Sequence, residues 1–389
     1  MIRHLDEPGW TNYKLILSHL VEYDLFDQQK SLYWDEETDS LGYLMEASPR
    51  LISKLRDHCH WITGVRSYDY KNHHLRMANL YKSKYDVLRN LDPKLEFFGE
   101  NRVLGDFGFE IENNLVNLDT LKFFESIMAL NLVGELERLK NTERPTVVEI
   151  GAGWGGFLSM LKKYVPNMQM VIVDLPMTLL FSATYLPTVF PELKVGYFGS
   201  KTFTGQEDII FMVPNQFPLW KPKRIDLAVN LVSFQEMTTE QVRNYSNQLK
   251  SKFCSVLYSY NKSKSENNTE IQNVNDCLSN WDYSHNIKLL NVDYTIIKLN
   301  SNEKLENSKQ KFSRKKLYLI KILRVFLSFF RGRLKSKLID LFYSFIKPEI
   351  CDIVLLDYKN QKKIRTRSGS SLVYEHKIYY SNLDFKFLK

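Results

Sequence analysis

Cysteine is scarce in this chain of 389 residues, which holds only Cys59, Cys254, Cys277 and Cys351. The four lie far apart, form no CxxC pair and have no spacing typical of metal ligands. This pattern argues against a disulfide framework and favours a reducing compartment.

Long uncharged apolar runs are also missing. The opening stretch, MIRHLDEPGWTNYK, lacks the apolar core of a signal peptide, and no uncharged stretch reaches transmembrane length. A hydrophobic content of 44% and a charged content of 25% are ordinary for a soluble globular protein of one large domain or two. We therefore expect a cytoplasmic protein.

The net charge of +8 comes from a single segment. Between Lys309 and Lys347 the sequence has twelve lysines and arginines and one acid, Asp340. This segment therefore carries a charge of +11, which leaves −3 (8 minus 11) for the rest of the chain. Because the positive charge is not spread over the chain, it does not predict nucleic-acid binding.

Glycine and proline are rare between residues 10 and 140, where apolar spacings near 3.6 residues predict helices. Either Asn117 or Asp119 is suited to cap the last of these helices. The stretch FFGENRVLGDFGFEIENN (Phe97–Asn114) interrupts the pattern with three glycines and predicts a turn-rich loop or a hairpin. Residues 1–140 are therefore expected to form a helical N-terminal region.

From residue 141 to 300, strand-like and helix-like runs alternate. The predicted strands are TVVEI, MQMVIVDL, KVGYF, DIIFMV, IDLAVNLV and CSVLYSY, and GGFLSMLKKY and MTLLFSATYL are predicted helices. Continuous apolar strands separated by helices indicate an α/β domain with a parallel sheet covered on both faces. Residues 301–389 are predicted to be a C-terminal extension with two closing strands, DIVLLDY and SLVYEHKIYY.

A glycine-rich turn, EIGAGWGG, joins the first of these strands to a helix. Glycines allow positive φ angles and a close approach of the backbone to a ligand, here at the carboxyl end of the first parallel strand. Gly151, Gly153 and Gly156 also match GxGxxG, the weak pattern of a dinucleotide fold. A tight turn without a ligand is the third interpretation.

Two acids flank the turn and separate these interpretations. Glu149 ends the strand two residues before Gly151, where its carboxylate can orient the loop and face a cationic amino group. Asp174 ends the next strand and is suited to accept hydrogen bonds from ribose hydroxyls, or to cap a helix. A pyrophosphate would gain nothing from Glu149, so the first acid favours S-adenosylmethionine over a dinucleotide such as NAD.

ExGxGxGG followed by VDLP resembles the class I methyltransferases, whose Rossmann-like fold has a mostly parallel, seven-stranded sheet. More narrowly, EIGAGWGGFLSML, VDLPMTLL and NLVSFQEM resemble the bacterial sugar O-methyltransferases, over about Leu118 to Asn261. SLYW (Ser31–Trp34) matches a habit of that family, and the resemblance is absent from Ser301 onward.

The resemblance implies an enzyme that methylates a sugar hydroxyl of a bacterial surface polysaccharide or its precursor, with S-adenosylmethionine as cofactor and S-adenosylhomocysteine as product. The N-terminal region would cover the cofactor and shape the acceptor pocket. A divalent metal ion is neither required nor excluded. The residues expected at the cofactor are Glu149, Gly151, Ala152, Gly153, Trp154, Gly155, Asp174, Leu175 and Asn230.

Methyl transfer to oxygen needs an acceptor held in line with the sulfonium and, for a sugar hydroxyl, a general base. Glu236, in the NLVSFQEM stretch (Asn230–Met237), is the first candidate for the base or for binding sugar hydroxyls. A solvated glutamate that opens the following helix is the alternative. Ser233 and Gln235 are expected at the acceptor, and His285 is the second candidate base.

Aromatic residues of the N-terminal region are candidates to stack on a sugar ring, although aromatics at such positions are more often part of the core. Tyr33 and Trp34 are the first choice, followed by Phe107 and Phe109 within the Phe97–Asn114 loop, which is the predicted site of acceptor contacts.

The segment Ser313–Lys347 has cationic residues on one helical face and leucines and phenylalanines on the other. This pattern is typical of a helix lying in an anionic membrane interface, which predicts peripheral contact with the inner membrane face. The alternatives are a helix pair packed on the core and a dimer contact.

Two other functions compete with sugar methylation. A different acceptor, RNA or a small metabolite, is one; RNA would need a basic, aromatic-lined groove beside the cofactor, whereas the positive charge here is confined to one segment. A non-catalytic membrane-surface protein that keeps the cofactor fold is the other.

Overall fold

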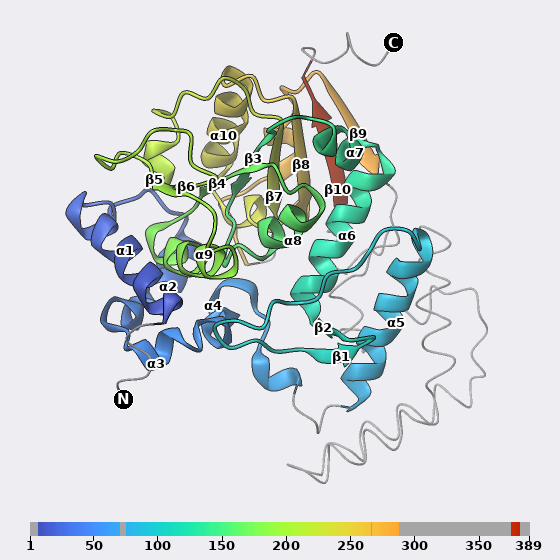
Figure 1. Ribbon diagram of the computed structural model, residues 1–389. Helices are drawn as coiled ribbons and strands as arrows, with labels where there is room; N and C mark the ends of the chain where they lie inside the picture. The colour runs from blue at the N-terminus through green and yellow to red at the C-terminus, as the bar shows by residue number, and fades with distance from the viewer. Residues whose placement is uncertain (1–6, 71–74, 266, 288–374, 382–389) are drawn as a thin grey trace. The chain divides into compact units, whose positions relative to one another are not determined.

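The computed structural model describes residues 7–70, 75–265, 267–287 and 375–381, which belong to one compact unit of the chain. Its centre is an eight-stranded sheet with the order β5-β6-β4-β3-β7-β8-β10-β9 (Figure 1). The strands are β3 Thr146–Ile150, β4 Gln169–Val173, β5 Val195–Tyr197, β6 Ile209–Met212, β7 Leu227–Leu231, β8 Val256–Asn261, β9 Tyr283–Ile287 and β10 Glu375–Tyr380.

The strands from β5 to β8 pair in parallel, and β10 runs antiparallel to both of its neighbours. The predicted α/β fold with a mostly parallel sheet is therefore confirmed. The described sheet has eight strands where seven were expected, because the three-residue β5 adds an edge beside β6. Each run predicted as a strand between residues 141 and 300 overlaps one of the observed strands, and β8 ends one residue beyond its predicted run, at Asn261.

The strand predicted in SLVYEHKIYY is β10, which lies between β8 and β9 although it comes last in the chain. The second predicted closing strand, DIVLLDY, and the basic segment 313–347 lie outside the described residues. In the ranges that are described, no helix has both the length and the hydropathy needed to cross a bilayer.

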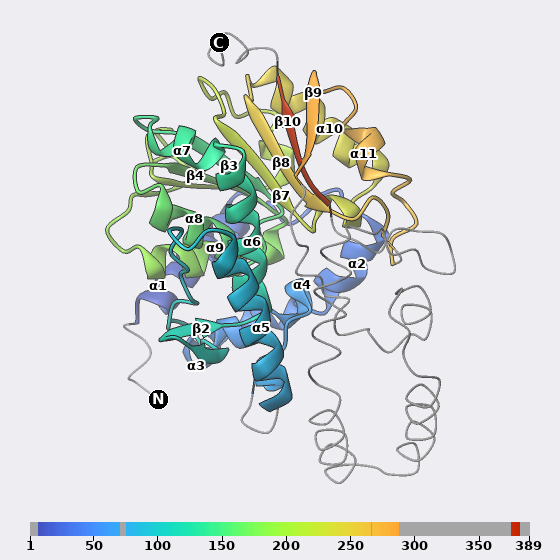
Figure 2. The same ribbon diagram turned by 90° about the vertical axis from the view of Figure 1, so that its right-hand side faces the viewer.

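Helices cover both faces of the sheet, as Figure 2 shows. On one side lie α6 Leu118–Leu132, α7 Glu135–Lys140, α8 Gly156–Tyr164 and α9 Pro176–Val189, and on the other α10 Thr239–Ser251 and α11 Val274–Cys277. This arrangement explains the sequence pattern, because strands covered on both faces, such as β4 and β7, are buried at every residue.

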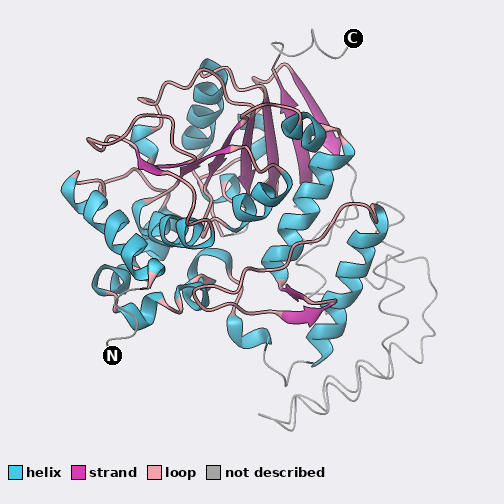
Figure 3. Ribbon diagram, in the orientation of Figure 1, coloured by secondary structure: helices cyan, strands magenta, loops and turns pink. Residues whose placement is uncertain are grey.

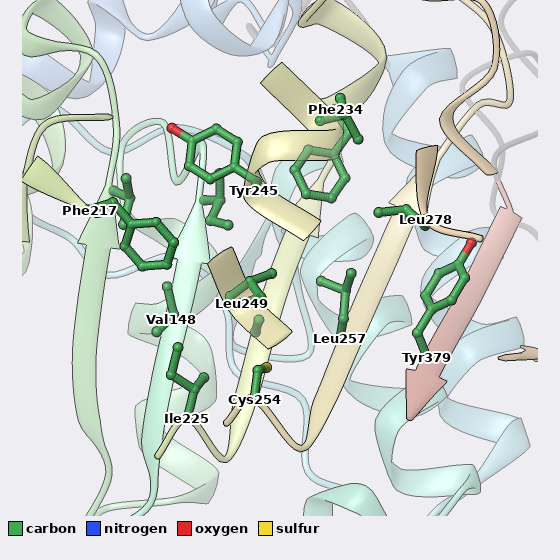
Figure 4. Close-up of a cluster of buried hydrophobic side chains, with 14 of the residues drawn as sticks. Val148, Phe217, Ile225, Phe234, Tyr245, Leu249, Cys254, Leu257, Leu278 and Tyr379 are labelled. Carbon is green, nitrogen blue, oxygen red and sulfur yellow. The ribbon is translucent and has the colours of Figure 1, made fainter. Parts of the chain in front are cut away.

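The core on the α10 side gathers apolar side chains from the sheet and from α10 (Figure 4). Val148 and Ile150 of β3 belong to this core together with Tyr245 and Leu249 of α10. Successive side chains of a strand point to opposite faces. Glu149 therefore points to the other face, toward the side of α6 and α8.

The N-terminal region is mostly helical, as predicted (Figure 3). It contains α1 Pro8–Glu22, α2 Leu32–Asp39, α3 Pro49–Ile52, α4 His60–Thr63 and α5 Leu75–Leu91, followed by the hairpin of β1 Phe109–Ile111 and β2 Asn114–Val116. Short 3-10 helices occur at Gly42–Glu46, Leu55–His58, Ser67–Tyr70, Pro214–Gln216 and Phe234–Glu236.

The hairpin confirms one of the two structures predicted for the glycine-containing stretch. Its two turn residues, Glu112 and Asn113, have positive φ angles of 50° and 64°, as a tight two-residue β-turn requires. Phe107, a candidate for sugar stacking, is buried and packs against the Arg56 guanidinium. It is therefore a core residue.

Helix α6 is capped by Asn117, whose side chain accepts a hydrogen bond from the Thr120 amide in a capping box. The helix is buried from Leu118 to Leu130, including three charged residues, Asp119, Lys122 and Glu125. We call these three the α6 charged stripe, since their spacing of three residues places them along one side of the helix. Charged groups are seldom this buried without partners.

Glu125, the last residue of the α6 charged stripe, connects α6 to strand β10. Glu125 Oε1 lies 2.8 Å from His376 Nε2, and His376 Nδ1 lies 2.6 Å from the hydroxyl of Tyr258 on β8. All three side chains are buried. This network explains how β10 is held in the sheet through side chains as well as through its strand pairing.

We expect Glu125→Leu to lower the free energy of unfolding by about 3 kcal/mol, because it leaves the buried His376 ring without its acceptor. Urea denaturation measures this. Glu137→Ala, at an exposed position of α7, is the control and should change stability by less than about 0.5 kcal/mol. Equal, small effects of both substitutions would contradict the role given to the network.

Candidate functional site

The glycine turn has the backbone that the sequence predicts. Gly151, Gly153 and Gly155 have φ angles of 70°, 58° and 83°, in the left-handed region that favours glycine. The Gly151 amide donates to Val173 O at 2.8 Å, which fixes the turn against the end of β4. A Cβ on Gly151 would lie 2.0 Å from Ser233 Oγ, so the turn touches the NLVSFQEM stretch directly.

Asp174 is aligned by the same turn. Its Oδ2 accepts a hydrogen bond from the Gly153 amide and its Oδ1 from the Leu175 amide, both at 2.8 Å. Helix α9 has Leu175 as its N-cap and Pro176 at its start, so Asp174 is not the plain N-cap considered above. Burial raises the pKa of Asp174 to about 7. The carboxylate is held beside the backbone that would line a cofactor.

Glu149 is the most deeply buried acid of the site. It is only 2% exposed, and its Oε2 has no hydrogen-bond partner among the described residues. Burial, reinforced by the nearby Asp174 carboxylate, raises the pKa of Glu149 well above its usual range. A buried carboxylate oxygen without a partner is costly. A cationic group from a ligand would remove that cost, and the amino group of S-adenosylmethionine fits this requirement.

Asn230 and Gln235 brace the backbone instead of facing a ligand. The Asn230 amide donates to Ile150 O at 2.8 Å, and its oxygen accepts from the Phe234 amide and from Asn261. Gln235 Oε1 accepts from the Lys262 amide at 2.9 Å. We therefore correct the expectation that these two side chains bind cofactor or acceptor.

Trp154 contributes its backbone to the turn, while its side chain points into the N-terminal region. The indole N–H donates to Asp119 Oδ2 at 3.2 Å, and the Arg56 guanidinium lies 3.9 Å from the ring centroid. The side chain is 3% exposed and packs inside the N-terminal region. The backbone amides of Ala152, which is buried, and Leu175, which is half-buried, both donate to the Asp174 carboxylate.

The end of β7 carries backbone strain. Val232 has a φ of 64°, an unusual angle for a β-branched residue. Strain of this kind is retained where the surrounding structure enforces it, often at functional sites. The conformation of Val232 brings Ser233 against Gly151. Glu236 follows in the 3-10 helix Phe234–Glu236.

Glu236 is half-buried, and its carboxylate forms no hydrogen bond or ion pair within the described part of the chain. Burial raises its pKa to about 8, with Glu37 and Asp174 adding to the shift and Lys122 and Lys262 opposing it. Asp174 and Lys122 also shift the pKa of Glu149, with the same signs.

Helix α2 of the N-terminal region docks on this stretch. Ser31 caps α2 and donates from its hydroxyl to Glu236 O at 2.6 Å. The half-buried Tyr33 and Trp34 follow, with ring centroids 5.6 Å apart. The SLYW and SFQEM motifs therefore meet through Ser31 and Glu236, which are 205 residues apart in sequence, and α2 begins beside Glu236.

His285 lies elsewhere. It is in the middle of β9, paired with Ile378 of β10, at the far edge of the sheet. Four strand spacings separate β9 from β3, a distance of about 19 Å. We therefore withdraw His285 as a candidate base.

Two residues of the site were missed by sequence reasoning, Glu37 of α2 and Lys122 of α6. Glu37 raises the pKa of Glu236, and Lys122 lowers it. The signal for Lys122 was available as three charged residues at three-residue spacing within an otherwise apolar helix. Among the described residues, no three His, Cys, Asp or Glu side chains are grouped as metal ligands.

Comparison with solved structures finds similar folds at low identity. A Nostoc punctiforme protein assigned as an O-methyltransferase is 11% identical, covers 72% of this chain and 92% of its own length, and has a TM-score of 0.30. A phosphoethanolamine N-methyltransferase of Haemonchus contortus is 10% identical over 68% of this chain and 58% of its own, with a TM-score of 0.33. An amino pentose methyltransferase of Micromonospora echinaspora is 12% identical over 35% and 50%, with a TM-score of 0.24.

No family model and no curated protein sequence matches the chain. At these identities and scores, the function has to be argued from the residues of the chain itself. They define an α/β protein with a glycine turn, two flanking acids and a third acid at the carboxyl edge of a parallel sheet.

Proposed function

We propose that this chain is an S-adenosylmethionine-dependent O-methyltransferase that acts on a sugar hydroxyl of a bacterial surface polysaccharide or its precursor. The observation that supports it most is the pair of buried acids around the glycine turn. Glu149 has an unpaired oxygen, and Asp174 is aligned by the Gly153 amide.

These residues fit the chemistry of the cofactor. Glu149 would hold the amino group, the backbone of Gly151–Gly155 would pass close to the ligand, and Asp174 would accept hydrogen bonds from the ribose. The cofactor supplies a methyl group activated by its sulfonium. A dinucleotide fits less well, because its pyrophosphate would meet the Glu149 carboxylate at the same turn.

Glu236 would act on the acceptor. Its unpaired carboxylate can take the proton from the acceptor hydroxyl as the oxygen gains the methyl group, and its raised pKa, about 8, suits a general base. Helix α2, with Tyr33 and Trp34, would hold the acceptor ring beside Glu236. This would supply the positioning that methyl transfer needs.

The charge of the site favours a neutral acceptor over RNA. Asp174 raises the pKa of both Glu149 and Glu236, and Glu37 also raises that of Glu236. Lys122 opposes both shifts, and Lys262 opposes the shift of Glu236. A polyanion would meet more carboxylates than cations there, whereas sugar hydroxyls bind readily to carboxylates. The sugar itself rests on the resemblance of the NLVSFQEM and SLYW motifs to the bacterial sugar O-methyltransferases.

Isothermal titration with S-adenosylhomocysteine tests the cofactor, and mass spectrometry of surface glycans from cells with and without the gene tests the acceptor. We expect heat of binding and the loss of one methyl group from one sugar residue. Binding without any missing methyl would favour a non-catalytic protein, and no binding would reject the proposed enzyme.

A further inference from the structure

Helix α4, His60–Thr63, lies against the glycine turn. A Cβ on Gly153 would lie 3.2 Å from Ile62 Cγ2, so even one added methyl group would press on this side chain. Figures 1 and 2 both show α4 next to α2, the helix that begins beside Glu236. The N-terminal region therefore reaches the proposed site at two places, with α2 at the acceptor acid and α4 at the turn.

The segment that leads into α4 is fastened to the same turn. The buried Arg56, four residues before α4, has its guanidinium carbon 3.9 Å from the Trp154 ring centroid and 4.4 Å from that of Phe107. Its Nη2 lies 2.9 Å from Asp119 Oδ2, which also accepts a hydrogen bond from the Trp154 indole at 3.2 Å. Trp154 directly follows Gly153 in the sequence. Arg56 therefore holds the chain at the turn just before α4 begins.

Ile62 is only half-buried, although it packs on the turn. The amide of Gly153, the residue on which it packs, donates to Asp174 Oδ2 at 2.8 Å. Ile62 thus keeps apolar surface exposed one residue away from a buried carboxylate that the turn aligns. Apolar surface in a binding site is stabilised when a ligand covers it.

The order of the chemical groups in the proposed cofactor indicates which part Ile62 would meet. In the proposed function, Glu149 holds the amino group and Asp174 the ribose, and the sulfur with its neighbouring carbons lies between these groups in the molecule. Gly153 likewise lies between the two acids, since it follows Glu149 in the turn and donates to Asp174. The side chain that packs on Gly153 therefore belongs at the sulfur.

We propose that Ile62 is a cofactor-contacting residue that covers the sulfur of the bound cofactor, with α4 as its support. The inference rests on the proposed function, because it takes that cofactor to be S-adenosylmethionine. An apolar side chain at the sulfur keeps water from the reactive methyl group. It also brings no charge, so it adds no preference between the cationic cofactor and its neutral thioether product.

The test compares the affinities for S-adenosylmethionine and S-adenosylhomocysteine, measured by isothermal titration calorimetry. The two ligands differ only in the methyl group and the positive charge on sulfur, so a distorted site weakens both alike. A charge placed at position 62 acts on the cation alone. We expect Ile62→Glu to shift the ratio of the two affinities about tenfold toward S-adenosylmethionine, and Ile62→Lys about tenfold toward S-adenosylhomocysteine.

Ile62→Gln is the uncharged control at the same position, and its ratio should stay within about twofold of the wild-type ratio. Val195→Glu is the control for a charge placed elsewhere. Val195 is also half-buried, and its strand, β5, lies three strand spacings from β3, a distance of about 14 Å. Its ratio should equal that of the wild type.

A wild type that binds both ligands, with charged variants at position 62 that leave the ratio unchanged, would overturn the inference alone, as would an equal shift in Val195→Glu. If one charged variant does not fold, the other carries the test, because the two expected shifts have opposite signs. A wild type that binds neither ligand rejects the proposed function, and the inference with it.

Discussion

Gly151→Ala should weaken the binding of S-adenosylhomocysteine by about ten- to a hundredfold, if the roughly 1 to 3 kcal/mol that forcing extra atoms into a packed site costs is lost from binding. The added Cβ would lie 2.0 Å from Ser233 Oγ and 2.5 Å from Ser233 Cβ, so either the glycine turn or the strained end of β7 has to move. Both carry residues of the proposed site. Titration calorimetry of the purified variant measures the loss.

Gly134→Ala is the matched control for this prediction. Gly134 also has a positive φ, 81°, but a Cβ there would meet no atom within 4 Å. Both alanines carry the backbone cost of the left-handed region, about 1 kcal/mol. We expect Gly134→Ala to lower stability by that amount and to bind S-adenosylhomocysteine like the wild type. Equal affinities of the two variants would show that the turn does not line the cofactor.

Local motifs were enough to predict which residues come together at the proposed cofactor site. The glycine turn, Glu149 and Asp174 lie at the ends of neighbouring strands, β3 and β4, and their arrangement follows from the parallel sheet alone. The strands themselves were predicted because continuous burial leaves continuous apolar runs. These features depend only on residues that are close together in the sequence, so local patterns are enough to predict them.

The other features of the site depend on contacts between segments that are far apart in the sequence. His285 was a candidate because it comes late in the domain, yet the insertion of β10 between β8 and β9 moves it to the sheet edge. Nothing in the sequence distinguishes an asparagine that faces a ligand from one, like Asn230, that braces Ile150 O. Lys122 and Glu37 come near these acids only because α6 packs beside the glycine turn and α2 packs beside Glu236.

Glu236→Gln should lower the rate of methyl transfer by about two to four orders of magnitude, the usual contribution of a general base. The affinity for S-adenosylhomocysteine should stay within about twofold, since Glu236 contacts the acceptor in this proposal. Glu240→Gln is the control, four residues on and exposed at the start of α10, and should keep wild-type activity. A Glu236→Gln rate within about threefold of wild type would leave this acid a binding residue at most.

The pH dependence follows from the same carboxyl group. A base must be deprotonated, and the pKa of Glu236 is raised to about 8, so wild-type activity should rise with pH and level off above about pH 8. The residual activity of Glu236→Gln should lack this rise.

The stability of the fold should depend on pH in the opposite direction. An acid with a raised pKa in the folded state binds its proton more tightly there than when unfolded, so its charging destabilises the fold as pH increases from about 4.5 through about 8. Glu236→Gln removes that cost, and urea denaturation should find the variant equal to wild type near pH 4 and more stable near pH 9, by at most about 5 kcal/mol, since one pKa unit corresponds to about 1.4 kcal/mol. A variant that gains no stability at alkaline pH would show that Glu236 is solvated, and the acceptor base would then have to be sought among other residues.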